Sequence, residues 1–211
     1  MANYEKLIEM IQQGDFSGCA NLVKELVQEG SAPNAVIQEG IGKALNIVGQ
    51  KFSEGECFIP EMLIAAKAAQ TSLDALKPAL AKAKVQPKGK IVIGTVHGDL
   101  HDIGKNIVAM ILSASGFQVI DLGVDVPAQK FVDTLKGERS RILALSCLIT
   151  TTMPAMESTV KAVKDAGLSG QVKIMIGGPS TTDDFARKIG ADFRGHDAYE
   201  ALNQAERWTK N

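Results

Sequence analysis

The sequence predicts two structural parts, a helical bundle followed by an α/β domain with a parallel sheet. Apolar residues recur at helical spacing over residues 1–87, whereas short apolar runs alternate with helical segments over residues 88–211. The pattern changes within Ala79–Lys90, which contains Pro87 and Gly89, and we expect a helix tail and then a linker there. A chain of 211 residues is long enough for two domains, each with its own core.

The first part is expected to contain four short helices joined by tight turns, which together form a small bundle. Gly14 ends the first helix and Asp15 caps the second. Pro33 opens the third helix, and a turn at Ser53–Glu56 follows it. The fourth helix is expected to stop at Pro78, because proline cannot donate the next helical hydrogen bond.

The second part alternates expected strands with expected helices. The strands are expected at 91–96, 117–122, 142–147, 172–176 and 191–193. The helices are expected at 102–115, 128–135, 154–166, 183–189 and 197–208. This alternation predicts an α/β fold, a Rossmann-like (flavodoxin-like) sheet of five parallel strands with helices on both faces. Ligands of such sheets bind at the carboxyl ends of the strands, where the strand order reverses.

Composition excludes several classes of protein. The net charge of −1 leaves no electrostatic footprint for nucleic acid or an anionic membrane. We expect no membrane span and see no signal peptide at the N-terminus. The cysteines Cys19, Cys57 and Cys147 are far apart, which argues against a disulfide framework and favours reduced thiols in a cytoplasmic protein.

Three loops that follow expected strands should share one edge of the sheet. They are Val96–Gly104, Ser146–Thr152 and Gly177–Thr181, and they bring imidazole, carboxylate, hydroxyl groups and bare backbone together. His101 can ligate a metal as the neutral ring, and Asp99 is close enough to fix its tautomer. These loops therefore predict a ligand site.

The same loops resemble the fingerprint of cobalamin-binding domains, in the motifs Asp99-x-His101-x-x-Gly104, Ser146-x-Leu148 and Gly177-Gly178. The longer stretch from Gly94 to Val108 is similar to the subgroup found in cobalamin-dependent methionine synthase and in stand-alone corrinoid proteins of methyltransferase systems. The stretch from Phe52 to Pro60 is similar to the helical cap of that family. The resemblance thus covers nearly the whole chain, as a cap domain at 1–87 and a cobalamin-binding domain at 88–211.

The resemblance implies that the protein binds cobalamin or a related corrinoid, as methylcobalamin or cob(I)alamin, in the base-off/His-on form. His101 would be the axial cobalt ligand, Asp99 would hydrogen-bond it, and Thr152 would complete the unit where methionine synthase has serine. Ser146 and Thr150 would contact the nucleotide tail. The cofactor-binding residues implied are Gly98, Asp99, Leu100, His101, Asp102, Ile103, Gly104, Ser146, Leu148, Thr150, Thr152, Gly177 and Gly178, with Phe52, Ile59 and Met62 from the cap.

Other interpretations of these residues are open. His97 and His101 have the spacing of a zinc pair on a helix, although Gly98 favours a loop. Phe52, Ile59 and Met62 have the spacing of ordinary bundle core. Ser146 and Thr150 can also be plain strand-end hydroxyls, and Cys147 can be a small buried residue.

The implied function is that of a methyl carrier. It would move a methyl group on cobalt from a substrate-specific methyltransferase to a second one with a tetrahydrofolate or thiol acceptor, and a reductive activase is a further expected partner. The chain leaves no room for a substrate-activating barrel, so we expect no catalysis by the protein alone. The alternatives are a cobalamin-dependent sensor or regulator, the small subunit of an adenosylcobalamin mutase, and a nucleotide-binding protein, which the missing Gly-x-Gly-x-x-Gly disfavours.

Overall fold

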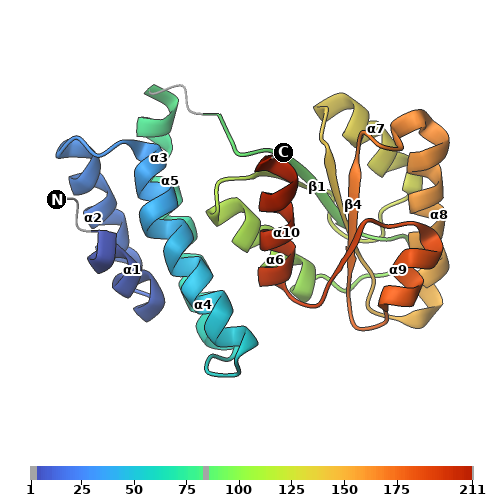
Figure 1. The fold of residues 1–211 in the computed structure, drawn as a ribbon, viewed down its shortest axis with the longest axis horizontal. Coiled ribbons are helices and arrows are strands. Elements are labelled where there is room, and N and C mark those ends of the chain that lie inside the picture. Colours follow the sequence, from blue (N-terminus) through green and yellow to red (C-terminus); the bar gives the residue numbers. More distant parts are fainter. Residues whose placement is uncertain (1–3, 83–85, 211) are drawn as a thin grey trace. The chain divides into compact units, whose positions relative to one another are not determined.

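A computed structural model describes residues 4–82 and 86–210, in two compact units (Figure 1). The first unit comprises Met1–Pro87 and Met110–Gly116, and the second comprises Lys88–Ala109 and Phe117–Asn211. Part of the linker expected within Ala79–Lys90, residues 83–85, lies outside the described residues.

The first unit is built from four helical rods, as the sequence predicts. Its helices are α1 (Tyr4–Gln13), α2 (Phe16–Gln28), α3 (Pro33–Ala35), η1 (Val36–Gly42), α4 (Lys43–Ser53) and α5 (Ile59–Lys82). The segments α3, η1 and α4 form one uninterrupted rod whose middle part is π-helical. Gly40 in that part lies against α1, where a Cβ atom would come 2.7 Å from Leu7 Cδ2.

The predicted helix signals at the first turn are confirmed. Gly14 has a φ of 76°, and the carboxylate of Asp15 accepts a hydrogen bond from the backbone N–H of Gly18 at 2.9 Å. The predicted stop at Pro78 is wrong, because α5 continues to Lys82. A proline removes one backbone hydrogen bond, and only a single helical turn follows it here, so the helix is completed despite that loss.

The second unit contains a five-stranded parallel sheet within the described residues, which confirms the predicted α/β fold. Its strands are β1 (Lys90–Thr95), β2 (Gln118–Asp121), β3 (Ile142–Ser146), β4 (Lys173–Gly177) and β5 (Phe193–Gly195). Their order is β2-β1-β3-β4-β5, which is the flavodoxin-like order. The order reverses between β1 and β3, so the loops after these two strands border the crevice in which such sheets bind ligands.

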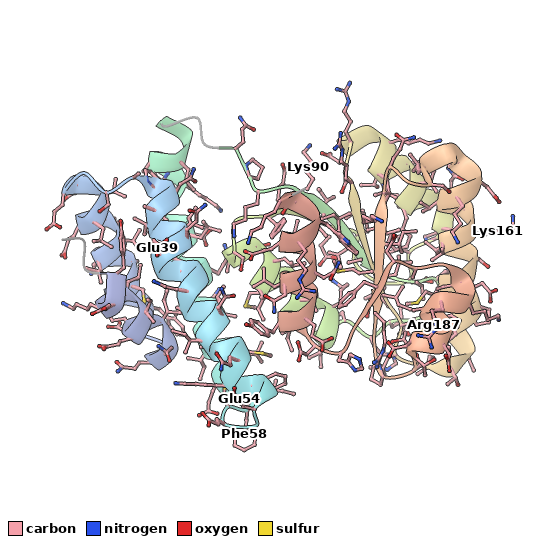
Figure 2. All side chains as sticks on the ribbon, in the orientation of Figure 1. Glu39, Glu54, Phe58, Lys90, Lys161 and Arg187 are labelled. Atoms are coloured by element: carbon pink, nitrogen blue, oxygen red, sulfur yellow. The ribbon has the colours of Figure 1, made fainter. Side chains whose placement is uncertain are left out.

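Helices cover both faces of this sheet. They are α6 (Ile103–Ala114), α7 (Ala128–Glu138), η2 (Thr150–Thr152), α8 (Met153–Val163), η3 (Lys164–Leu168), α9 (Asp183–Ile189) and α10 (Ala198–Lys210). Figure 1 shows α7, α8 and α9 on one face, and α6 and α10 on the other. The outer side chains Lys161 and Arg187 point away from the sheet (Figure 2) and are 74% and 71% exposed.

The main core of the second unit lies under α7, α8 and α9. It contains Val92 and Leu143 from the strands and Phe131 and Met156 from the helices, all with 0% exposure. Gly94 allows the Phe131 ring to approach β1, since a Cβ atom there would lie 2.8 Å from the ring. No helix among residues 4–82 and 86–210 is long and apolar enough to cross a membrane.

The last strand lies two residues later than the sequence predicts. The expected strand at 191–193 is observed as Phe193–Gly195, because Ala191 still closes α9 and pairing with β4 begins only with the N–H of Asp192, which donates to the carbonyl of Ile174 at 2.8 Å. The N–H of Ala191 closes the end of α9 on the carbonyl of Ala186, and the carboxylate of Asp192 accepts the N–H of Ile174 at 2.9 Å. Periodicity alone does not show such capping bonds.

Arg139 offers a test of how α7 ends. It closes that helix with a φ of 54°, a left-handed conformation that favours glycine. We expect Arg139→Gly to raise the free energy of unfolding by about 0.5–1 kcal/mol, because it removes the steric strain of the Cβ atom. Urea denaturation measures the change. Arg139→Ala, which removes the charge but keeps the Cβ atom, should give no such gain.

Candidate functional site

The candidate site lies at the carboxyl ends of β1 and β3. After Thr95 the chain forms a loop that carries Asp99 and His101 and then enters α6. After Ser146 it forms a second loop, which leads through η2 into α8. The strands are buried runs of apolar residues that hold these loops at one edge, so both loops border the reversal of strand order.

Asp99 joins the two loops. Its carboxylate is 0% exposed and accepts four hydrogen bonds. Oδ1 accepts the backbone N–H of His101 at 3.0 Å and lies 2.7 Å from His101 Nδ1. Oδ2 accepts the N–H of Leu148 at 2.7 Å and the hydroxyl of Thr152 at 3.1 Å. One buried carboxylate therefore fixes both the histidine ring and the loop after β3.

These bonds keep Asp99 ionised. Burial alone would raise the pKa of its carboxyl, but the hydrogen bonds from His101, Leu148 and Thr152 outweigh it and lower the pKa to about 2. An ionised carboxylate can only accept a hydrogen bond, so Nδ1 of His101 must carry the proton. The neutral ring then has its lone pair on Nε2.

His101 presents that lone pair outward. Its side chain is 52% exposed, and Nε2 has no hydrogen-bonding partner in the part of the chain that the structure describes. The hydroxyl of Thr95 also holds the carbonyl oxygen of His101, at 2.9 Å. A fixed tautomer with a free Nε2 is the arrangement of a metal-ligating histidine whose ring is oriented by a carboxylate.

Thr152 occupies the hydroxyl position without displacing its neighbours. Besides Asp99, its hydroxyl contacts the carbonyl oxygen of Ile149 at 2.9 Å and the Sγ atom of Cys147 at 3.2 Å. The methyl group of threonine lies near Gly98, where a Cβ atom would make an ordinary contact of 3.4 Å with Thr152 Cγ2. We call Asp99, His101 and Thr152 the ligand unit.

Large apolar side chains lie on the same two chain segments as the ligand unit and are exposed. Leu100 and Ile103 are 71% and 76% exposed, and Leu148 and Ile149 are 39% and 38% exposed. Among the described residues of the second unit, the large hydrophobic side chains that are exposed are these four. Such a concentration of exposed apolar surface around one imidazole indicates a site for a ligand with apolar faces. We call these four residues the apolar rim.

The paired glycines lie at the carboxyl end of β4, where Gly177 is the last residue of the strand and Gly178 follows it. Gly178 has a φ of 120°, and a Cβ atom there would lie 2.0 Å from the carbonyl oxygen of Cys147. Gly177 is less constrained, since a Cβ atom there would meet Gly195 at an ordinary 3.5 Å. Gly178 is therefore required by the backbone, whereas Gly177 leaves room at the edge.

The remaining candidate residues are placed less uniformly. Ser146 is partly buried at the end of β3, Thr150 and Asp102 are exposed, and Gly104 has open space where a Cβ atom would lie. In the first unit, Met62 is 5% exposed and belongs to the bundle core.

The other cap residues lie on either side of the turn between α4 and α5, Phe52 in α4 and Ile59 at the start of α5. Ile59 is 50% exposed and Phe52 is half-buried. The neighbouring Phe58 extends from this turn (Figure 2) and is 69% exposed. The assignment of these positions to a cofactor-covering cap stays a prediction.

Two contacts near the site were not predicted from the sequence. Asp125, in the loop after β2, accepts the N–H of Gly98 at 2.7 Å. Lys105, in the first turn of α6, is almost fully buried and pairs with Asp121 at the end of β2, at 2.5 Å. Each contact joins the segment after β1 to β2 or to the loop after it, and no pattern in the sequence pairs positions so far apart.

The zinc interpretation finds no geometric support. His97 and His101 lie on a loop and bond to different carboxylates, His97 to Asp125 and His101 to Asp99, each at 2.7 Å. Within the described residues, no three His, Cys, Asp or Glu side chains are grouped so as to hold a metal ion. The two imidazoles are therefore held apart by separate anchors.

Comparison with known proteins agrees with this geometry. Residues 89–203 match a family model described as a B12 binding domain, and residues 4–77 match a second model with the same description. The chain is 40% identical to trimethylamine corrinoid protein 1 of Methanosarcina mazei over 98% of both chains.

Solved structures agree as well. A cobalamin-binding protein from Desulfitobacterium hafniense DCB-2 is 33% identical and covers 99% of both chains, with a TM-score of 0.82. The methanol:cobalamin methyltransferase complex MtaBC from Methanosarcina barkeri contains a chain that is 29% identical, with a TM-score of 0.80 over 98% of this chain and 80% of that one. From its matched domains and its relatives, this chain belongs to the family of cobalamin-binding corrinoid proteins.

Proposed function

We propose that the protein carries a methyl group on a corrinoid bound at the ligand unit, between a substrate-specific methyltransferase and a second, acceptor methyltransferase. One observation carries the proposal. His101 is anchored by a buried carboxylate through Nδ1, and its Nε2 faces outward amid the apolar rim. The bound corrinoid would supply a cobalt atom that accepts and releases a methyl group.

The residues present fit such a cofactor. A neutral imidazole with a free Nε2 suits cobalt, and the apolar rim suits the flat, largely apolar body of a corrin ring. Gly104 leaves open space in the first turn of α6, beside Ile103 of the rim. His101 would hold the metal from one side in the base-off/His-on form, and the remaining residues of the site would exclude water and orient the ring.

Each member of the ligand unit has its own task in this proposal. Asp99 keeps the proton on Nδ1 and prevents rotation of the ring. Thr152 and the N–H of Leu148 hold the carboxylate in place. Because the carboxylate stays ionised, it would keep accepting from Nδ1 and so leave Nε2 as the atom that holds the metal.

The names of the relatives support the partners in this proposal. They include trimethylamine and dimethylamine corrinoid proteins, and a chain of the complex with a methanol:cobalamin methyltransferase has the same fold. We propose one methyltransferase partner of that kind, a second one that takes the methyl group onward, and a reductive activase. Methylamine methyltransferases are the first donors to test.

The domain limits and the location belong to the same proposal. We propose a cap domain at residues 1–87, which would include Phe52, Ile59 and Met62, and a cofactor domain at 88–211. A cytoplasmic location is supported by the cysteines at 19, 57 and 147, all of which are free thiols in the structure.

His101→Ala is the direct test of cobalt ligation. The full chain is reconstituted with hydroxocobalamin, and its visible spectrum is recorded. We expect the parent protein to show a histidine-ligated, base-off spectrum, and the variant to lose it with an affinity at least about 10-fold lower, because the ligand is gone. Added imidazole should restore the spectrum.

His97→Ala is the matched control, since it removes an imidazole from the same loop. It should keep the histidine-ligated spectrum, because His97 is held by Asp125 and lies outside the ligand unit. Failure of the parent protein to bind hydroxocobalamin tightly would contradict the proposal. Transfer of a labelled methyl group to and from the loaded protein by purified methyltransferases then tests the carrier role.

A further inference from the structure

We propose that Asp125 is a positioning residue for His101, acting through the backbone of Gly98 and Asp99. The inference rests on the proposed function, since it concerns His101 as the cobalt ligand. Asp125 lies in the loop between β2 and α7, outside the three motifs that the sequence singled out.

Asp125 makes hydrogen bonds to the backbone of Gly98 and of Asp99, the residue that orients His101. Its carboxylate Oδ1 accepts the N–H of Gly98 at 2.7 Å, and its own N–H donates to the carbonyl oxygen of Asp99 at 3.0 Å. Gly98 has a φ of 82° and no side chain, so its backbone has a wide conformational range without these bonds. Asp125 therefore fixes the direction in which the chain places Asp99.

The conformation of Asp125 shows that its place is imposed by its surroundings. It has a φ of 53°, and within the described residues Asp125 and Arg139 are the non-glycine residues with a positive φ. Arg139 simply ends a helix, whereas Asp125 lies between two strand-like bonds, from Thr95 N–H to Gly123 and from Val126 N–H to Thr95. Strained conformations persist where neighbouring contacts determine them, and they gather at functional sites.

The charge of Asp125 strengthens the bond to Gly98. The Gly98 N–H lowers the pKa of the Asp125 carboxyl below its usual value, and the nearby His97 ring contributes less. The group is therefore an anion at neutral pH, and hydrogen bonds to anions are the stronger kind. The side chains of His97 and Asp125 are 68% and 47% exposed, so we expect their ion pair to contribute little to the stability of the loop.

Asp125 thus supports the ligand unit from the side opposite to Thr152. From the loop after β3, Leu148 and Thr152 hold the carboxylate of Asp99. From the loop after β2, Asp125 holds the backbone on both sides of Asp99 Cα. If only one support remains, the Asp99 side chain can tilt, and the His101 ring tilts with it.

The test compares Asp125→Gly, Asp125→Asn and His97→Ala in the full chain reconstituted with hydroxocobalamin. Asp125→Gly removes the acceptor and also relieves the positive φ, so these effects oppose each other and the stability of the corrinoid-free protein should change little. We expect the ratio of histidine-ligated to unligated cobalt, read from the visible spectrum, to fall about five-fold. Asp125→Asn should restore most of the ratio, because an amide oxygen still accepts the Gly98 N–H and asparagine tolerates a positive φ.

The outcomes separate this inference from the proposed function. A parent protein without a histidine-ligated spectrum would overturn the proposed function itself. A normal parent together with an unchanged Asp125→Gly variant would overturn only the role of Asp125. The role of Asp125 would also be overturned if His97→Ala lost as much histidine ligation as Asp125→Gly. The same holds if the loss of ligation in the three variants were proportional to the decrease in their unfolding midpoints.

Discussion

Replacing Asp99 by alanine is expected to destabilise the protein by about 3 kcal/mol and to abolish histidine ligation of the corrinoid. The variant leaves the N–H groups of His101 and Leu148 without their acceptor. It also frees the His101 ring to rotate and to take either tautomer. Both losses follow from one carboxylate, because it accepts four hydrogen bonds while it is fully buried.

Asp99→Asn removes the charge of the side chain but keeps its size and shape. Its oxygen can still accept from His101, but its amino group faces the N–H of Leu148, so one bond becomes a contact between two donors. We expect an intermediate loss of about 1–2 kcal/mol, with weaker histidine ligation than in the parent protein. Equal stability of the parent, alanine and asparagine proteins would contradict the anchoring role of Asp99.

The dependence of stability on pH provides an independent measurement. The folded pKa of Asp99 is lowered from 3.8 to about 2, so the ionised form stabilises the fold above about pH 4. That stabilisation, about 2 kcal/mol, is lost as the pH falls from about 4 towards 2. Urea denaturation of the corrinoid-free protein at both ends of this range should show the loss in the parent protein. Asp99→Asn should lack this contribution, because an amide does not titrate.

Much of the fold could be predicted because its signals are local. The buried strands are continuous apolar runs, and the bundle helices end at residues such as Gly14 whose backbone requires glycine. The errors have local physical causes as well. Pro78 removes a single hydrogen bond where little helix remains, and β5 begins late because the N–H of Ala191 bonds back to Ala186 at the end of α9.

The candidate site was predictable to a smaller extent. His101 and Asp99 are two residues apart, so their contact follows from the sequence, and Thr152 follows from its place after a neighbouring strand. The role of Asp125 could not be predicted, because its bonds to Gly98 and Asp99 join two loops through a left-handed conformation that is uncommon for residues other than glycine. Contacts of this kind depend on the register of β1 and β2, which only the folded chain defines.

Gly178→Ala is the second variant with a large expected effect. Its Cβ atom would lie 2.0 Å from the carbonyl oxygen and 2.8 Å from the carbonyl carbon of Cys147, at a φ of 120°. Both obstacles are backbone, so no side-chain rotation relieves them, and we expect a loss of at least about 3 kcal/mol in the free energy of unfolding. The loop after β4 should also shift, since the carbonyl oxygen of Gly178 accepts both the N–H and the hydroxyl of Thr181.

Gly177→Ala is the matched control, and it distinguishes a glycine required for folding from one that leaves space for the cofactor. Its Cβ atom would make only an ordinary contact, so the stability of the corrinoid-free protein should stay within about 1 kcal/mol of the parent value. If the nucleotide tail of the cofactor, which we expect at Ser146 and Thr150, also passes Gly177, the same variant should still bind hydroxocobalamin more weakly, because the added methyl group occupies the space of the tail. Gly178→Ala would then fail in folding and Gly177→Ala in binding. Equal stability of the two variants would contradict the steric argument. Unaltered binding of hydroxocobalamin by Gly177→Ala would show that the tail does not pass the end of β4.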